Sequence, residues 1–289
     1  MLNNLIDKIK KLRELTNMSF SLCKEAVIKT NSEAESIEYL KKNSSLNFDN
    51  ISRKKTSNGQ VKSYGLENFC FSIKVNCETD FVSKNHEFSF LLDKISFFIV
   101  ENIKYLQKNT IYTYNEFIKD EFLMLNIKKI LNESILLFKE NIVFSDFVLF
   151  FGVCGYYNHS NNSVTSIAVL DIKDYNYEQD YKIVNELIKD ISMQIAAMNP
   201  LYISSENISK EILEKERENI LNSISKEKKN SKNMNFIISG KMNKFFNTFC
   251  LLEQNFIKDE NILIKDLIIK YYNIINKTII VSKIFRDYV

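Results

Sequence analysis

The sequence predicts an α+β protein with a three-helix bundle, two α+β core subdomains and an inserted helical hairpin. Apolar residues recur at helical spacing before residue 45, and strict alternation begins at Phe69, with helical periodicity after it. A charged helical stretch of low hydrophobicity then interrupts a second strand-and-helix unit. These changes of pattern divide the chain into a bundle at 1–45, a linker at 46–60, a first core subdomain at 61–140, a second at 141–206 and 247–289, and a hairpin at 207–246.

The composition is typical of a globular protein that keeps its thiols reduced. Of 289 residues, 45% are hydrophobic and 26% charged, and the net charge of +3 is far below that of a dedicated nucleic-acid binder. We therefore expect no required nucleic acid. No window approaches the roughly 18 apolar residues of a membrane span, and no leader segment precedes the first helix, so we expect a cytoplasmic protein without a membrane partner. The five cysteines form no C-x-x-C pair, which argues against a disulfide framework or a zinc site.

Three short helices are expected before residue 45. Ser32 and Glu35 have the spacing of a capping box, which places the start of the third helix at Ser32. A bundle of this size buries little surface by itself, so it is expected to serve as a docking module. The periodicity places three apolar residues on one face of each of the first two helices and turns three of the third helix inward: Leu5, Ile9 and Leu12, then Phe20, Cys23 and Val27, then Ala34, Ile37 and Leu40.

The two core subdomains are expected to combine strands with long helices. The alternation that begins at Phe69 and ends at Cys77 predicts a half-buried strand, followed by helices at about 84–106 and 114–140. The second subdomain is expected to have strands near 143–157 and 163–172, a helix that Pro200 stops, a helix near 261–275 and a final strand at 278–285. In the helix before Pro200 the inward-facing residues are Ile183, Leu187, Ile191 and Ile195.

The sequence contains no complete catalytic or ligand-binding motif. The five glycines form neither a phosphate-binding loop nor a dinucleotide fingerprint, so we expect no direct nucleotide binding. His86 and His159 lie in no metalloprotease or nucleophile motif, and the thiol of Cys77 at the end of an apolar strand is expected to pack. Glu78 and Asp80 without further ligands make a poor metal site. We expect a protein that is not an enzyme and has no cofactor and no metal.

One segment, Val75-Asn76-Cys77-Glu78-Thr79-Asp80-Phe81-Val82, stands out because a buried strand ends in a polar turn that a large aromatic residue follows. The alternation is already broken at Phe81. The pattern alone favours a ring that folds back into the core. The second interpretation is an exposed aromatic anchor for a partner's pocket, and the pattern does not choose between the two.

At these residues the chain resembles the elongation factor Ts family, the exchange factors of elongation factor Tu. The string VNCETDFV at 75–82 is similar to the signature of that family. Similar segments recur in family order at 12–16 and 23–26, Lys139-Glu140-Asn141-Ile142, Tyr157-Asn158-His159, Gln194-Ile195-Ala196-Ala197 and 239–245.

The resemblance implies a fold and a mechanism. It implies that the N-terminal bundle is ubiquitin-associated-like and grips the GTPase, with Arg13 and Phe20 as candidate contacts. It implies that the turn Thr79, Asp80, Phe81 and Val82 enters the partner, displaces Mg²⁺ and disturbs the phosphate site, so that GDP leaves and GTP rebinds. His159 is a further candidate contact in the second subdomain.

Other functions remain open at this stage. A partner of the GTPase that holds it, like a chaperone, without accelerating exchange is one alternative. An RNA-associated helical protein that uses Lys226–Lys232 is another, although the near-neutral charge argues against it. The sequence also leaves open a homo-oligomer or a 2:2 complex with elongation factor Tu.

Overall fold

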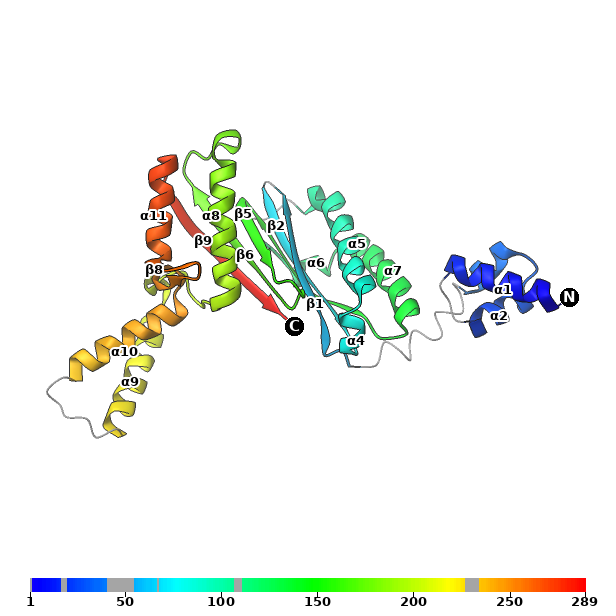
Figure 1. Ribbon diagram of the computed structural model, residues 1–289, viewed down its shortest axis with the longest axis horizontal. Helices are drawn as coiled ribbons and strands as arrows, with labels where there is room; N and C mark the ends of the chain where they lie inside the picture. Colours follow the sequence, from blue (N-terminus) through cyan, green and yellow to red (C-terminus); the bar gives the residue numbers. More distant parts are fainter. Residues whose placement is uncertain (1, 17–19, 41–54, 67, 107–110, 227–233) are drawn as a thin grey trace.

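The protein consists of stacked helical and sheet layers, as seen in the computed structural model (Figure 1). Antiparallel sheets and helices make it an α+β protein. Two sheets pack face to face in the centre, and a pair of helices covers each outer side. These helices are α8 (Tyr177–Met198) and α11 (Ile264–Ile275) on one side, and α5 (His86–Asn102) and α7 (Glu121–Phe138) on the other. The structure describes residues 2–16, 20–40, 55–66, 68–106, 111–226 and 234–289.

The first sheet has the strand order β1-β2-β4-β3, and the second has the order β5-β6-β9. All neighbouring strands in both sheets are antiparallel. The strands of the first sheet are β1 (Asn58–Leu66), β2 (Phe69–Cys77), β3 (Ile111–Thr113) and β4 (Val143–Phe151). Those of the second are β5 (Val153–Asn158), β6 (Val164–Ile172) and β9 (Ile279–Tyr288), and a small separate hairpin pairs β7 (Asn255–Phe256) with β8 (Asp259–Leu263).

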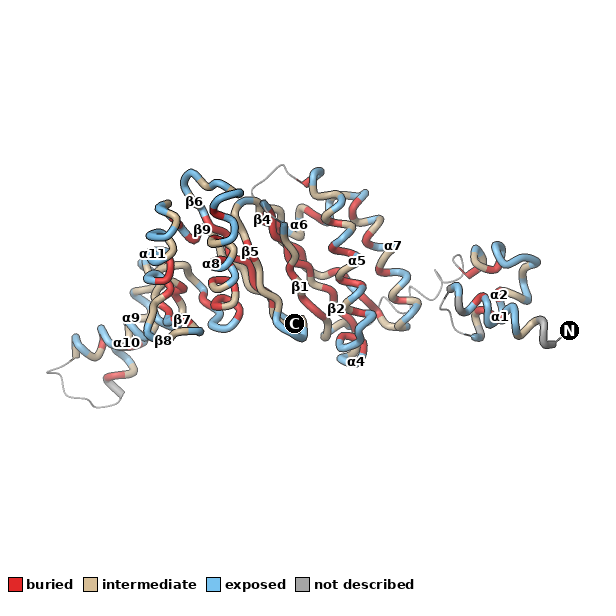
Figure 2. Tube along the Cα trace, turned by 45° about the horizontal axis from the view of Figure 1, so that its top comes forward, coloured by how far each residue is buried: buried red, intermediate tan, exposed pale blue. Residues whose placement is uncertain are grey.

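The first half of strand β2 is buried on both faces, so the prediction of a half-buried strand is confirmed only for the second half, where Lys74 and Asn76 are partly exposed. Phe71 and Ile73 face helices α5 and α7, as the alternation predicts. On the other face, Cys70 and Ser72 are also buried, because the second sheet covers them. In Figure 2 this strand is one of the most continuously buried parts of the molecule. The strand that leads into the polar turn is therefore held from both sides over its first half.

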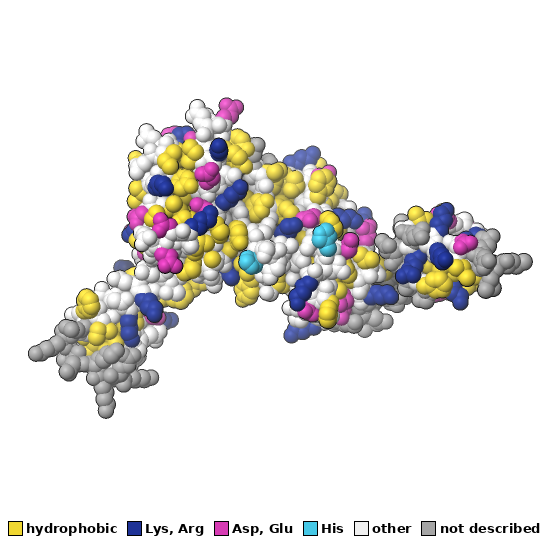
Figure 3. Space-filling view, viewed as in Figure 1, with side chains coloured by type: hydrophobic (Ala, Val, Ile, Leu, Met, Phe, Trp, Pro, Cys, Tyr) yellow, Lys and Arg dark blue, Asp and Glu magenta, His cyan; other side chains and the backbone are white. Residues whose placement is uncertain are grey.

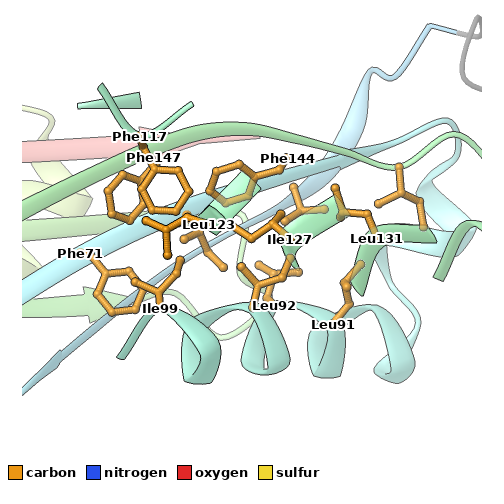
Figure 4. Close-up of a cluster of buried hydrophobic side chains, with 14 of the residues drawn as sticks. Phe71, Leu91, Leu92, Ile99, Phe117, Leu123, Ile127, Leu131, Phe144 and Phe147 are labelled. Carbon is orange, nitrogen blue, oxygen red and sulfur yellow. The ribbon is translucent and has the colours of Figure 1, made fainter. Parts of the chain in front are cut away.

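The core of the first subdomain is rich in phenylalanine. Residues from the sheet, from α5 and α7, and from the short helix α6 (Tyr114–Phe117) meet in one cluster (Figure 4). The rings of Phe117 and Phe147 are only 4.2 Å apart between centroids. Since burial of one such side chain is worth about 1.5–3 kcal/mol, this cluster is a rigid base for the turn that follows β2.

The expected boundary between the two core subdomains is misplaced. The sequence pattern places residues 141–151 in the second subdomain, but β4 pairs with β2 and β3 in the first sheet. The left-handed conformation of Lys139, with φ 58°, ends α7 and turns the chain back into this sheet. The chain crosses to the second sheet at Gly152, whose φ of 122° favours glycine. The expected linker at 46–60 also overlaps β1, and its residues 46–54 lie outside the described part.

The long helical stretches are divided more finely than the periodicity predicts. The stretch at 84–106 is helix α5 followed by a short 3-10 turn, Ile103–Tyr105. The stretch at 114–140 is α6 followed by α7, because the Asp120 side chain accepts a hydrogen bond from the Leu123 N–H and starts a new helix. Helix α8 ends before Pro200, as predicted, with Asn199 in the left-handed conformation.

The N-terminal region contains helices α1 (Leu2–Thr16) and α2 (Phe20–Lys29) and a helical segment at 33–40. Ser32 accepts from the Glu35 N–H as a capping box requires, but the Glu35 carboxylate accepts from the N–H of Asn31 rather than Ser32. The inward assignment of Ala34 is wrong, because this residue is exposed, and Phe20 is 45% exposed although it shares a helix face with the buried Cys23. Among the described residues of this region, the buried ones are Ile9, Leu12, Cys23, Ala26, Ser36 and Leu40.

A pair of helices projects from the second subdomain in Figure 1. They are α9 (Lys210–Lys226) and α10 (Met234–Phe249), and the residues that join them, 227–233, lie outside the described part. Ile220, Ile224 and Ile238 form a small core between them. The pair has its own apolar contacts and does not contribute to the two central sheets.

An ion pair fixes the start of α8 to the segment before β9. Lys277 Nζ lies 2.6 Å from Asp180 Oδ2, and the two side chains are only 20% and 7% exposed. Burial acts to raise the pKa of Asp180, but the hydrogen bonds from Lys277 and from the Asn176 N–H outweigh burial, so the pKa lies below its usual value.

We expect Lys277→Met to lower the free energy of unfolding at pH 7 by about 1–3 kcal/mol, because it leaves a buried carboxylate without its cation. A group with a lowered folded pKa stabilises above its ordinary pKa and loses this effect as the pH falls through the folded value. The difference between the two proteins should therefore shrink below pH 3.8. Urea titrations at several pH values measure it, and a difference that does not change with pH would contradict this account.

Candidate functional site

The polar turn after β2 presents Phe81 to solvent. Residues Asp80–Ser83 form a short helix, α4, and Thr79 is its N-cap, with Oγ1 accepting from the Val82 N–H at 3.4 Å. Phe81 lies in this helix and is 83% exposed. The interpretation of Phe81 as a core residue is therefore wrong. Its neighbour Val82 is 9% exposed and packs into the first core, so Val82 anchors the turn and is not available as a contact.

A carboxylate from a distant segment clamps this turn. Glu140 accepts two hydrogen bonds from Thr79, one from the backbone N–H at 3.0 Å and one from Oγ1 at 2.6 Å. In the other direction, Glu78 Oε1 accepts from the Asn141 N–H at 2.7 Å. The N-terminus of α4 is thus held against the loop that follows α7, and hydrogen bonds to a charged acceptor are among the stronger ones in proteins.

The role of Glu140 and Asn141 is not visible in the sequence pattern. Both residues lie in the segment Lys139–Ile142 that carries part of the family resemblance, but the clamp spans 61 residues from Thr79. From the sequence pattern, a polar pair just after a long apolar helix is interpreted as an ordinary turn exposed to solvent. Only the antiparallel pairing of β2 with β4 brings the two turns together.

Asp80 is exposed and carries its charge beside Phe81. Its carboxylate forms an ion pair with Lys84 at 2.8 Å, one turn further along the chain. The hydrogen bond and the charge of Lys84 lower the pKa of Asp80 below its usual value. A carboxylate that stays ionised at neutral pH, next to an exposed aromatic ring, can attract cations and hydrogen-bond donors of a partner.

Cys77 does not have the properties of a nucleophile. It is fully buried, its Sγ donates to the Thr79 carbonyl at 3.2 Å, and burial together with the charge of Glu140 raises its pKa to about 12. The thiolate is the reactive form of cysteine, so this thiol is chemically inert at neutral pH.

We expect iodoacetamide at pH 8 to leave Cys77 unmodified in the folded protein, because only about one thiol in 10⁴ is ionised there when the pKa is near 12. Peptide mass spectrometry measures the modified fraction. The same reaction on urea-unfolded protein is the control, in which all five cysteines should react. Rapid alkylation of Cys77 in the folded protein would contradict the assignment.

The other predicted contacts lie on the surface. Arg13 is exposed in the last turn of α1, and Phe20 is 45% exposed at the start of α2. His159 is exposed in the turn between β5 and β6, beside an apolar cleft. The structure brings no two of these residues into contact with each other or with Phe81. The cleft is lined by Tyr157, His159, Ser163, Val164, Met193, Ala196, Ala197 and Ile257.

Comparisons with known proteins identify the family. The family model described as "Elongation factor TS" matches residues 78–284. The chain belongs to the elongation factor Ts family. An elongation factor Ts of Halothermothrix orenii is 31% identical over 275 residues, which are 90% of this chain and 85% of that protein. Those of Nitratiruptor sp. and Aquifex aeolicus are 32% and 30% identical, over 90% and 91% of this chain and 85% and 91% of theirs.

As a member of the elongation factor Ts family, the chain is a translation elongation factor that acts as a nucleotide-exchange factor for elongation factor Tu. The family match includes the turn with Phe81, the clamp at Glu140 and the turn with His159. The bundle lies before the matched residues. Among the described residues, no helix combines the length and the apolar run that a bilayer crossing needs.

Proposed function

We propose that Asp80 and Phe81 form a wedge that enters elongation factor Tu beside its Mg²⁺ and phosphate site and thereby speeds the release of GDP. The observation that carries the proposal is the 83% exposure of Phe81 on a turn that Glu140 and Asn141 hold in place. A large aromatic ring on a rigid turn loses little conformational entropy when it binds, which is a property of binding hot spots.

Mg²⁺ bridges and neutralises phosphate charge, so its displacement removes much of what holds GDP. Burial of one phenylalanine supplies about 1.5–3 kcal/mol, and about 1.4 kcal/mol corresponds to a tenfold change in affinity. The wedge alone is therefore too weak for both binding and exchange. We assign the remaining affinity to a wide interface that includes Arg13 and Phe20 of a ubiquitin-associated-like bundle, and His159 of the second subdomain.

The proposed action is non-covalent and reciprocal. If the wedge loosens GDP by some factor, GDP loosens the exchange factor by the same factor, so a new nucleotide releases it. The protein itself needs no cofactor, holds no nucleotide and makes or breaks no covalent bond in this scheme. Its place of work is the cytoplasm, where translation proceeds.

The test is the release of a fluorescent GDP from elongation factor Tu in the presence of increasing amounts of the protein. We expect the release rate to rise with concentration and to reach a plateau, because the exchange complex becomes saturated. Complex formation with an unchanged release rate would support the alternative, a partner that binds the GTPase without exchange activity.

A further inference from the structure

A buried amide connects the wedge to the turn that carries His159. Gln60 of β1 is 4% exposed. Its Nε2 donates to the Ser83 carbonyl at 2.6 Å, and its Oε1 accepts from Ser89 Oγ and from Asn162 Nδ2, each at 3.0 Å. Ser83 is the last residue of α4, the helix of Phe81. One side chain therefore bonds to the wedge helix and to the β5–β6 turn at the same time.

The β5–β6 turn is itself well ordered. The Asn162 N–H donates to the His159 carbonyl at 2.8 Å, and the His159 N–H donates to the Val164 carbonyl at 2.9 Å. Asn162 adopts the left-handed conformation, with φ 53°, that asparagine tolerates better than most residues. The position of His159 is thus fixed relative to Asn162.

The same turn covers the free edge of β1. The Val61 N–H donates to the Asn162 carbonyl at 2.9 Å, and the Asn158 side chain bonds both the N–H and the carbonyl of Ser63, each at 2.8 Å. An edge strand without such partners would leave its backbone groups unpaired. These bonds join the two sheets next to Gln60, so the amide bridge lies within a rigid region and not in a loose loop.

The wedge helix and the His159 turn also lie close together, because both are bonded to the amide of Gln60. Histidine side chains, which are cyan in Figure 3, are visible on one face of the molecule. Because the wedge helix and the His159 turn lie close together, a single partner can reach both regions.

We propose that Gln60 is a positioning residue that holds the wedge and the His159 turn as one two-point contact for elongation factor Tu. This inference rests on the proposed function. When two contacts are fixed relative to each other, making the first raises the effective concentration of the second. The losses caused by Phe81→Ala and His159→Ala are then not additive, because each contact supports the other.

The first measurement uses the free protein and no partner. Gln60→Leu removes the hydrogen bonds to α4 and to the β5–β6 turn, and it replaces the amide with an apolar side chain of similar size. We expect amide hydrogen exchange at Lys84 and Asn85, whose N–H groups end α4, to become about tenfold faster. The matched control is Gln254→Leu. Gln254 is also fully buried, and both atoms of its amide form hydrogen bonds, but its partners Gln194 and Thr248 lie outside α4 and the β5–β6 turn. It should leave exchange at these two amides unchanged.

The second measurement is the affinity for nucleotide-free elongation factor Tu, by calorimetry, for Phe81→Ala, His159→Ala and the double variant. Each variant lowers the affinity by some factor. In the wild-type background we expect the product of the factors for the two single variants to exceed the factor for the double variant by about fivefold. In the Gln60→Leu background this excess should fall below about twofold. If Gln60→Leu does not fold, Asn162→Gly decides, because glycine keeps the left-handed turn and removes only the side-chain bond to Gln60.

Unchanged hydrogen exchange, or a coupling that persists in both variants, would overturn the inference. Failure of the proposed function looks different. In that case Phe81→Ala and His159→Ala leave the affinity unchanged in every background, whatever Gln60→Leu does to hydrogen exchange in the free protein.

Discussion

Phe81→Ala is expected to slow the stimulated release of GDP from elongation factor Tu by tenfold or more, which corresponds to about 1.4 kcal/mol or above. The side chain is 83% exposed in the free protein, so it makes few contacts there, and its removal acts on the complex. Stopped-flow measurements with a fluorescent GDP, over a range of concentrations of the exchange factor, give both the plateau rate and the half-saturating concentration. We expect the plateau rate to fall more than the affinity, because the wedge acts on the nucleotide site.

The chain provides a matched control for this prediction. Phe236 in α10 is 82% exposed, so Phe236→Ala removes the same chemical group from an equally exposed position on another part of the molecule. We expect a change of less than about twofold in stimulated exchange for this variant and melting temperatures within about 2 °C of wild type for both. Equal effects of the two variants, or unfolding of Phe81→Ala, would contradict the assignment of Phe81.

Glu140→Ala has the second-largest expected effect. The variant leaves the Thr79 N–H and hydroxyl without their acceptor, and hydrogen bonds to charged groups are worth about 1.5–3 kcal/mol each when the partner stays buried. Because Thr79 is half-buried, we expect a loss of about 1–3 kcal/mol in the free energy of unfolding. The wedge then samples many orientations, and we expect stimulated exchange to fall by about tenfold at 25 °C. Urea titration and fluorescent-GDP release measure the two effects.

Two further variants distinguish the clamp from a general effect of charge. Glu140→Gln keeps an oxygen acceptor for the Thr79 N–H, so its activity should lie between those of wild type and Glu140→Ala. Glu133→Ala removes an exposed carboxylate of α7, the helix that precedes Glu140; its ion pair with Lys94 lies in solvent, so stability should change by less than about 0.5 kcal/mol. A Glu140→Ala protein that is destabilised but exchanges nucleotide at the normal rate would show that the clamp does not position the wedge.

The sequence predicts local structure well where a single face decides it. The alternation from Phe69 to Cys77 and the helical repeat before Pro200 depend on neighbouring residues, and both elements are confirmed. The burial of Cys70 depends instead on a second sheet, whose first strand begins only at Val153, far along the chain from Cys70. Periodicity contains no information on how two sheets pack, so the second buried face could not be predicted.

The candidate site, too, could be predicted from the sequence only in part. The pattern identifies the turn, but whether Phe81 points inward or outward depends on which residue of the turn fills the core. Val82 fills it, and Glu140 fixes the backbone so that Phe81 stays outside. The bridge through Gln60 to Asn162 crosses between the two core subdomains, and neither residue belongs to a motif. Such contacts follow from the tertiary structure alone.

Photo-crosslinking from position 81 shows where this side chain lies in the complex. Benzoylphenylalanine in place of Phe81 is irradiated in the complex with elongation factor Tu, and the linked peptides are identified by mass spectrometry. We expect one dominant crosslink, to the segments of the GTPase that surround Mg²⁺ and the phosphates, and we expect this crosslink to disappear when GDP is added in excess. Crosslinks that stay within the exchange factor, in the free protein and in the complex alike, would contradict the proposed wedge.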